Sequence, residues 1–412
     1  MKKILYFIVP ILIGIVFAFG LSKFLDNKIL SLVKSKNLVP LMSQYESEIK
    51  DKGVLINEYL LSKGDIMMLG SSELSKTIKR QHPTKYFNTN RSENNIFITG
   101  RPYSQDLQDV LTLGSADSKG NSDLKSNNKK KKVVLLVSMQ WFLRKDGVAA
   151  KEFQNRFSPA QFYAFLNNPN ISKENKDYVA KRVAEPLKGG SQYNSEAVYA
   201  KLYNNHTAIG KVEKILLDPY LYFREKTVSL KEKGLLYKEL RKLPNKGDKI
   251  NKIGKPINWK DEDSEAIKDA EKRVDGNKYK IDKAYYNHTL KKELKKMKNK
   301  YSKVDLLASK ELDDYKTFLS ICKDLDIDPT IVIMPNAKWY YDYTGLSQEK
   351  RDKYYDTIDN LAKDKGFNVM NLKDKETEDY YLRDVMHLGT RGWVDISERL
   401  YKEYNQGEIF NR

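Results

Sequence analysis

Five short apolar runs, separated by segments with helical periodicity, constrain this chain more than any other feature of its 412 residues. The runs span residues 65–69, 95–99, 133–137, 330–334 and 367–372. Helical patterns follow the second, third and fourth runs over residues 104–113, 304–325 and 348–365. Short buried strands that alternate with helices predict an α/β fold with a doubly wound, mostly parallel sheet. In such a sheet, ligands bind at the carboxyl ends of the strands.

The N-terminus carries a membrane signal. Residues 4–22 form an uncharged run of 19 residues between Lys2–Lys3 and Lys23. As a helix this run would be about 28 Å long, close to the ~30 Å thickness of the hydrocarbon core. We therefore expect one N-terminal transmembrane helix. A cleaved signal peptide remains the alternative, because residues 18–20 loosely fit a small-x-small cleavage site. Since more lysines follow the run than precede it, the positive-inside rule leaves the orientation open.

A long helical and charged stretch interrupts the alternation of strands and helices. We interpret it as a helical insertion that divides the α/β domain into two parts. The predicted boundaries are 1–23 for the anchor, 24–60 for a membrane-proximal linker with helical segments, 61–148 for the first part of the α/β domain, 149–303 for the insertion and 304–412 for the second part.

Charge and cysteine content narrow the classes of function. The chain has 74 Lys and Arg against 55 Asp and Glu, a net charge of +19, which favours an anionic partner or else only a solvated basic surface. No nucleic-acid-binding signature occurs, and the anchor argues against such a partner. The single cysteine, Cys322, excludes an internal disulfide framework and a Cys-cluster metal site. Glycine-rich phosphate loops are absent from the sequence. We expect no metal and no cofactor.

A serine follows the first predicted strand. Gly70-Ser71-Ser72 ends that run, and a helix is expected to begin near Ser72. A serine at such a turn exposes its hydroxyl and has its N–H at the positive end of a helix, which suits a nucleophile whose oxyanion must be stabilised. The alternative is an ordinary N-cap, the commonest role of serine at a helix start.

One of the four histidines can serve this serine. His387 follows Asp384 by three residues and precedes a glycine turn and a helix expected near Thr390. An aspartate at that spacing can hold one imidazole nitrogen and leave the other free to take a serine proton. A surface ion pair is the alternative, and metal ligation is disfavoured because no second ligand has suitable spacing.

The early Gly-x-Ser and late Asp-x-x-His resemble the SGNH (GDSL-type) hydrolase superfamily. Three further blocks, at residues 138–142, 341–345 and 387–393, make the chain similar to the DltD family, the D-alanyl transfer proteins of the teichoic acid D-alanylation (Dlt) operon. The resemblance runs from the anchor to the last helix and is weakest over residues 150–320. It implies a flavodoxin-like sheet, and a single-pass cell-membrane protein of Gram-positive bacteria with its catalytic domain on the extracellular face.

The resemblance also assigns roles to residues. It implies Ser72 as the nucleophile, Asp384 as the orienting acid and His387 as the general base. The remaining candidates are Gly100 and Asn336 as oxyanion donors, and Gln140 and Trp141 as residues lining the substrate cleft. The chain departs from the family pattern in several places. Met139 stands where proline is usual, Pro102 where a second glycine is usual, and Asn336 comes one residue early. For Trp141, a place in the core is the alternative.

The implied activity is transfer of D-alanine onto the hydroxyls of lipoteichoic acid through a D-alanyl-serine ester. The implied partners are a membrane-bound O-acyltransferase of the Dlt system, the D-alanyl carrier protein, a small tyrosine-ended Dlt peptide, lipoteichoic acid and the membrane, with no nucleic acid. Two alternatives stay open. An SGNH-type esterase or deacetylase would pass the acyl group to water, and a non-catalytic scaffold would only recruit the carrier protein.

Overall fold

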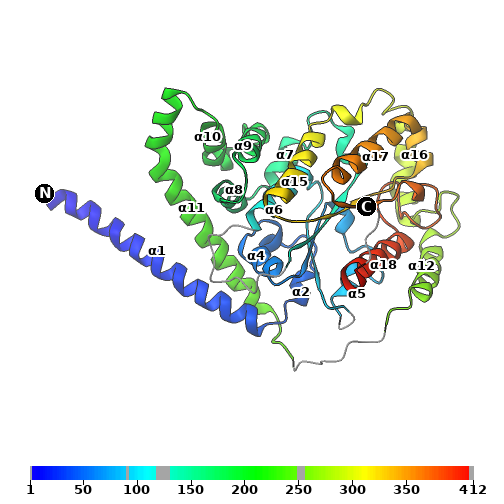
Figure 1. Cartoon of the computed structure of the whole chain (residues 1–412), viewed down its shortest axis with the longest axis horizontal. Helices are drawn as coiled ribbons and strands as arrows, with labels where there is room; N and C mark the ends of the chain where they lie inside the picture. The colour runs from blue at the N-terminus through cyan, green and yellow to red at the C-terminus, as the bar shows by residue number, and fades with distance from the viewer. Residues whose placement is uncertain (1, 90–91, 117–129, 248–255, 408–412) are drawn as a thin grey trace.

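The computed structural model describes residues 2–89, 92–116, 130–247 and 256–407, with side chains from residue 13 onward. A five-stranded parallel sheet forms its centre (Figure 1). The strands are β1 Ile66–Leu69, β2 Ile96–Thr99, β3 Lys132–Val137, β4 Thr330–Ile333 and β5 Asn368–Asn371. Their order is β2-β1-β3-β4-β5, the flavodoxin-like order, so the chain changes direction across the sheet between β1 and β3. The prediction of an α/β fold with a parallel sheet is confirmed.

The strands form where the sequence has its apolar runs because both faces of the sheet are covered. Every residue of β1, β2 and β4 is buried. A strand buried on both faces needs apolar side chains at successive positions, and this explains why these segments lack polar alternation. Each strand end lies within one residue of the end of its predicted run.

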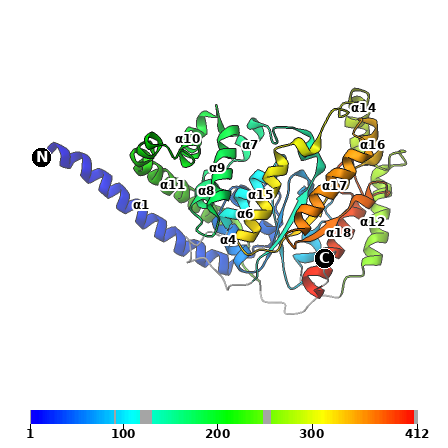
Figure 2. The same ribbon diagram turned by 45° about the horizontal axis from the view of Figure 1, so that its top comes forward.

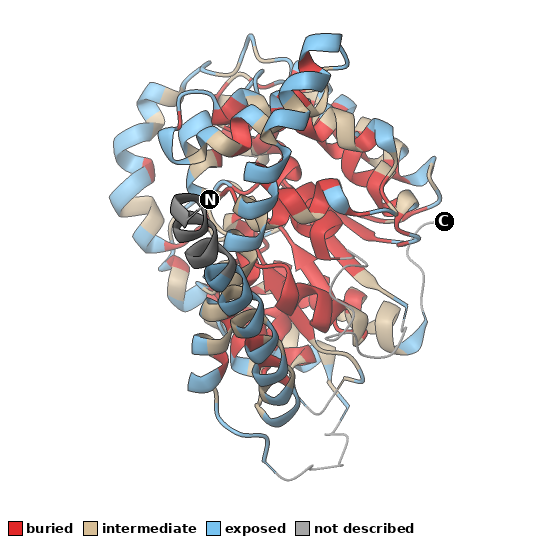
Figure 3. Ribbon diagram, turned by 90° about the vertical axis from the view of Figure 1, so that its left-hand side faces the viewer, coloured by how far each residue is buried: buried red, intermediate tan, exposed pale blue. Residues whose placement is uncertain are grey.

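Helices cover both faces of the sheet, as a doubly wound fold requires. On one face, Met67 and Leu135 pack in a cluster with Val110, Phe318 and Ile358. The helices of this face are α4 Leu55–Ser62, α6 Asp106–Ala116, α15 Glu311–Asp324 and α17 Gln348–Lys363. On the other face, Met68 and Leu136 pack with Phe87 and Trp393, and the helices are α5 Pro83–Phe87, α12 Trp259–Val274 and α18 Thr390–Gln406. Figure 3 shows the buried layer that results.

Between β3 and α15 the described chain is helical. The elements are η3 Met139–Leu143, α7 Ala150–Arg156, α8 Pro159–Asn167, α9 Lys173–Leu187, η4 Ser191–Tyr193, α10 Asn194–Tyr203, α11 Ala208–Lys242, α12, α13 Lys283–Tyr285, the π-turn η5 Tyr286–Leu290, α14 Lys291–Met297 and η6 Leu306–Ala308. These helices pack onto the sheet domain in two places, because α8 contacts α6 while α12 contacts α18. The shorter elements η1 Ser72–Leu74, α16 Lys338–Tyr343 and η7 Lys373–Lys375 follow β1, β4 and β5.

The N-terminal helix α1 Lys2–Ser35 extends away from the body (Figures 1 and 2). Its C-terminal part packs against α11 through Leu25, Ile29 and Val33, and α2 Val39–Met42 and α3 Glu48–Asp51 then lead to α4. Among the residues that could be searched, no helix is both long enough and apolar enough to cross a bilayer. The side chains of residues 2–12, and residue 1 altogether, belong to the predicted anchor but lie outside the described part.

Candidate active site

The nucleophile candidate Ser72 lies just after β1, the strand between β2 and β3. The chain turns at Gly70 and Ser71, and Ser72, where we expected a helix to begin, starts η1, a single 3-10 turn. Its Oγ lies 2.9 Å from Nε2 of His387. The structure therefore brings together the two residues that sequence analysis paired across the whole domain.

A loop in front of α18 positions His387. Its Nδ1 lies 2.8 Å from Oδ2 of Asp384, and the other carboxylate oxygen accepts the backbone N–H groups of Met386 at 2.9 Å and of His387 at 2.8 Å. A carboxylate held in this way faces Nδ1, so we assign the proton to Nδ1. The lone pair of Nε2 then points to the hydroxyl of Ser72, the arrangement of a serine triad.

The charges of this triad shift two pKa values. Burial of the Asp384 carboxyl alone would raise its pKa, but the charge of His387 and the hydrogen bonds to Asp384 hold it below its usual value. Burial likewise favours neutral His387, but the neighbouring Asp384 carboxylate outweighs it and raises the pKa of the imidazole above 6.5. Asp384 is thus ionised, and the basicity of His387 is increased.

Glu73 fixes the turn that carries Ser72, a role that sequence analysis missed. Its side chain is 2% exposed. One carboxylate oxygen accepts the backbone N–H of Ser71 at 3.0 Å, and the other accepts Nε2 of Gln140 at 3.2 Å. Its charge also contributes to the raised pKa of His387. The only sequence signal was a carboxylate directly after the serine.

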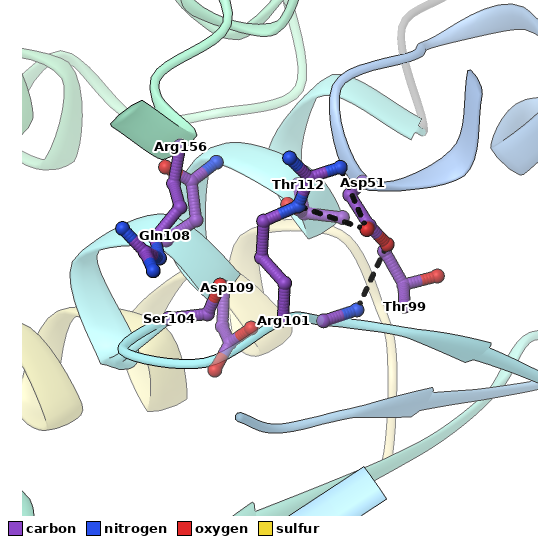
Figure 4. A pocket seen from close by; sticks show the side chains of 9 residues that line it. Asp51, Thr99, Arg101, Ser104, Gln108, Asp109, Thr112 and Arg156 are labelled. Atoms are coloured by element: carbon purple, nitrogen blue, oxygen red, sulfur yellow. Dashed lines mark hydrogen bonds and ion pairs between the residues drawn. The ribbon is translucent and has the colours of Figure 1, made fainter. Parts of the chain in front are cut away.

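Gly100, the predicted second oxyanion donor, follows β2 and makes a different contact in this structure. Its backbone N–H donates to Oδ1 of Asp51 at 3.0 Å, and Nε of Arg101 donates to the other oxygen at 3.0 Å (Figure 4). Gly100 has φ +155°, and a Cβ at this position would lie 2.0 Å from the carbonyl oxygen of Gly70. Only glycine therefore fits between the end of β2 and the turn that precedes Ser72.

Asp51 belongs to a buried ionic cluster next to this glycine. The neighbouring Lys50 is fully buried, and its Nζ donates to the backbone oxygens of Met42, Gln44 and Ile98. Burial lowers the pKa of Lys50 to about 7 and raises that of Asp51 to about 6. A small polar pocket adjoins Gly100 on this side (Figure 4). Its lining residues are Asp51, Thr99, Gly100, Arg101, Ser104, Gln108, Asp109, Thr112 and Arg156.

The other predicted residues follow strands but do not all face the serine. Gln140 comes from η3, after β3, and reaches the turn through Glu73. Asn336, after β4, is 1% exposed, and its Nδ2 donates to the hydroxyl of Tyr355 at 3.0 Å. Trp141 is 2% exposed and packs within the core cluster beneath the sheet. The structure thus places Trp141 in the core rather than along a cleft.

Within the part of the chain that the structure describes, no group of three or more His, Cys, Asp or Glu side chains is arranged to hold a metal ion. Cys322 is buried, and burial raises the pKa of its thiol.

Comparison with known proteins agrees with the resemblance in the sequence. The family model described as DltD protein matches residues 42–405. The chain is 27% identical to Protein DltD of Bacillus subtilis (strain 168) over 360 residues, which cover 87% of each chain. It is 26% identical to Protein DltD of Staphylococcus aureus (strain NCTC 8325 / PS 47) over 358 residues, or 85% of this chain and 84% of the relative. Protein DltD of Lacticaseibacillus rhamnosus is 25% identical over 354 residues, or 84% of this chain and 79% of the relative. Because the family model spans most of the sequence, including the residues around Ser72 and His387, the chain belongs to the DltD family.

Proposed function

We propose that this chain is a serine-dependent acyltransferase that carries D-alanine to the hydroxyls of lipoteichoic acid. Proteins of the DltD family take part in the D-alanylation of teichoic acids. The observation that carries the proposal is the contact of 2.9 Å between Ser72 Oγ and His387 Nε2, backed by Asp384 at 2.8 Å from Nδ1. This arrangement provides a hydroxyl, a base that can take its proton and a carboxylate that fixes the base.

The reaction has two acyl-transfer steps. His387 takes the proton of Ser72 as the serine oxygen attacks the carbonyl carbon of an activated D-alanyl group. The leaving group takes that proton from His387, and a D-alanyl-serine ester remains. A teichoic acid hydroxyl then loses its proton to His387 and attacks the ester. Ser72 leaves and regains a proton from His387, so the enzyme returns to its starting state.

The oxyanion of each tetrahedral intermediate requires N–H donors. The N–H of Ser72, at the first position of η1, has no acceptor within that turn, and we assign it to this role. The N–H of Gly100 donates to Asp51 instead, so it can join only if that bond of 3.0 Å opens. The Nδ2 of Asn336 is likewise committed to Tyr355.

The site is proposed to work at the extracellular face of the cell membrane. The apolar run of residues 4–22 would anchor the chain, and the two-part α/β domain is proposed to be of the SGNH type. The net charge of +19 suits a polyphosphate acceptor. The family resemblance adds the membrane-bound O-acyltransferase, the carrier protein and the small tyrosine-ended peptide as proposed partners.

The test compares transfer with hydrolysis. Purified full-length protein in detergent is given a D-alanyl thioester with or without lipoteichoic acid, and both esterified and free D-alanine are measured. The proposal expects ester on lipoteichoic acid, and Ser72→Ala should abolish it. Release of free D-alanine alone, unchanged by lipoteichoic acid, would assign an esterase. Unchanged transfer by Ser72→Ala would contradict any catalytic use of this serine.

A further inference from the structure

Exposed large hydrophobic side chains are concentrated on two helices. Among the described residues, sixteen such side chains are exposed, of which six lie on α1 and eight on α11. On α11 they are Ile209, Val212, Ile215, Leu216, Tyr220, Tyr222, Phe223 and Leu235. A soluble surface normally scatters exposed apolar residues singly, whereas a contiguous group marks an interaction site.

The first half of α11 carries apolar side chains on its outward face, which an ordinary surface helix leaves polar. Its polar groups Arg224 and Glu225 point to the body, where Arg224 pairs with the buried Glu196 at 3.0 Å and Glu225 accepts from Asn167 at 3.1 Å. The apolar residues point outward, with Ile209 and Leu216 each 73% exposed. Residues 209, 212, 216, 220 and 223 follow each other by three or four positions and so form one stripe. We call this stripe, together with Ile215 and Tyr222, the outer face of α11.

The outer face lies on the same side of the molecule as the free part of α1. The two helices run in the same direction. Ser35 contacts Lys246 near their C-terminal ends, and Asp26 pairs with Lys233 about two and a half turns before those ends. Their N-terminal halves then project from the same side of the sheet domain (Figures 1 and 2). A bilayer into which α1 inserts at this side is therefore also within reach of α11.

The composition of the outer face fits the boundary between lipid headgroups and acyl chains. It combines aliphatic side chains with Tyr220, Tyr222 and Phe223, and aromatic rings of this kind favour the membrane interface. A lysine lies beside these rings, because Lys226 Nζ is 5.0 Å from the ring centre of Tyr222. Lysine stems can lie along apolar surface while the ammonium groups reach anionic headgroups.

We propose that the outer face of α11 lies on the surface of a bilayer with anionic headgroups, as a second membrane contact beside α1. The inference rests on the membrane anchor proposed above. One helix alone lets the catalytic domain turn about its axis, whereas two contacts hold the domain in one orientation. Ser72 would then face a fixed direction relative to the membrane in which its acceptor is rooted.

The experiment places a fluorescent label at single introduced cysteines in the full-length chain. The native Cys322 is fully buried, so unsubstituted protein serves as the blank for labelling. Leu216→Cys reports the outer face, Phe17→Cys reports α1, and Lys238→Cys is the matched control at the other end of α11, where the side chain is also exposed. Each protein is reconstituted into phosphatidylglycerol vesicles with and without a nitroxide on the acyl chain near the headgroup.

We expect the label at position 216 to lose roughly half or more of its emission in nitroxide vesicles, because an interfacial helix buries its apolar face about 5–10 Å into the bilayer. The label at 238 should lose little, and quenching at 216 should weaken in phosphatidylcholine. Quenching at 17 without quenching at 216 would overturn the inference and leave the anchor intact. Quenching at neither position would overturn the anchor as well. A label at 216 shielded from aqueous iodide yet not quenched by lipid would show that protein covers this face, which also overturns the inference.

Discussion

Ser72 and His387 are separated by 315 positions in the chain, yet their Oγ and Nε2 atoms lie 2.9 Å apart. The sheet causes this approach. Ser72 follows β1, the strand between β2 and β3. His387 lies just before α18, and α18 packs on the sheet face where Met68 of β1 contacts the same buried cluster as Trp393. The turn that carries Ser72 adjoins β1 and the loop that carries His387 adjoins α18, so the contact is aligned before any substrate binds.

The first prediction distinguishes the two adjacent serines. Ser72→Ala removes the hydroxyl that faces His387, so esterified D-alanine on lipoteichoic acid should fall to background in cells that carry only this variant. Ser71→Ala removes one long contact, from its Oγ to the carbonyl oxygen of Arg101 at 3.4 Å, and keeps the backbone bond to Glu73. It should only weaken D-alanylation. The opposite ranking would move the nucleophile to Ser71.

A second prediction concerns the coupling of Asp384 and His387. Asp384→Asn keeps the shape of the side chain but can place an NH₂ donor where a carboxylate oxygen accepts from Nδ1 of His387. The imidazole then takes the wrong tautomer, so the rate should fall by about 10⁴, as in serine triads. His387→Ala should cost at least as much. Residues that act as a unit are not additive, so the double variant should be little worse than the poorer single variant. Rates with a D-alanyl thioester measure this, and losses that multiply would show two independent roles.

The third prediction is a pH profile. His387 must be neutral to accept the serine proton, and its pKa is raised above 6.5 mainly because the Asp384 carboxylate outweighs burial. Activity should therefore be full at alkaline pH and fall as the pH drops through a midpoint above 6.5. In Asp384→Asn the remaining activity should have its midpoint at lower pH, because the carboxylate charge that raises the pKa of His387 is gone. The pH dependence of kcat/KM reports this pKa in the free enzyme. An unchanged midpoint in that variant would mean that another group titrates.

A fourth prediction tests the packing of Gly100 against the turn before Ser72. Gly100→Ala adds a Cβ that would lie 2.0 Å from the oxygen of Gly70, at φ +155°. We expect a loss of about 1–3 kcal/mol in the free energy of unfolding, with reduced activity because the turn before Ser72 must move. The matched control is Gly234→Ala within α11, where a Cβ meets no atom within 4 Å. That change should stabilise the protein by about 0.5–1 kcal/mol. Denaturant unfolding compares the two, and equal effects would contradict the close approach.

The sequence predicted those parts of the fold and site that depend on local pattern. Apolar runs identify β1 to β4 because a strand covered on both faces has no polar alternation. The placement of Ser72 and His387 at element ends then makes their meeting foreseeable, since the carboxyl ends of parallel strands share one edge.

Contacts between distant elements were not predictable. Asp51 lies in α3 with no motif around it. Its hydrogen bond from the N–H of Gly100 depends on how α3 packs against the end of β2. Trp141 follows a strand as a cleft residue would, yet its ring turns into the core. Likewise, apolar periodicity on α11 reveals a stripe but not that the stripe faces outward.

The most direct measurement of the central claim is to trap the acyl-enzyme. Full-length protein is mixed with an isotopically labelled D-alanyl thioester, quenched in acid and digested, and the peptides are weighed by mass spectrometry. We predict one added alanyl group on the peptide that contains Ser72, absent from Ser72→Ala and discharged when lipoteichoic acid is added before the quench. Label on a different residue, or transfer to lipoteichoic acid by Ser72→Ala, would contradict a D-alanyl-serine intermediate.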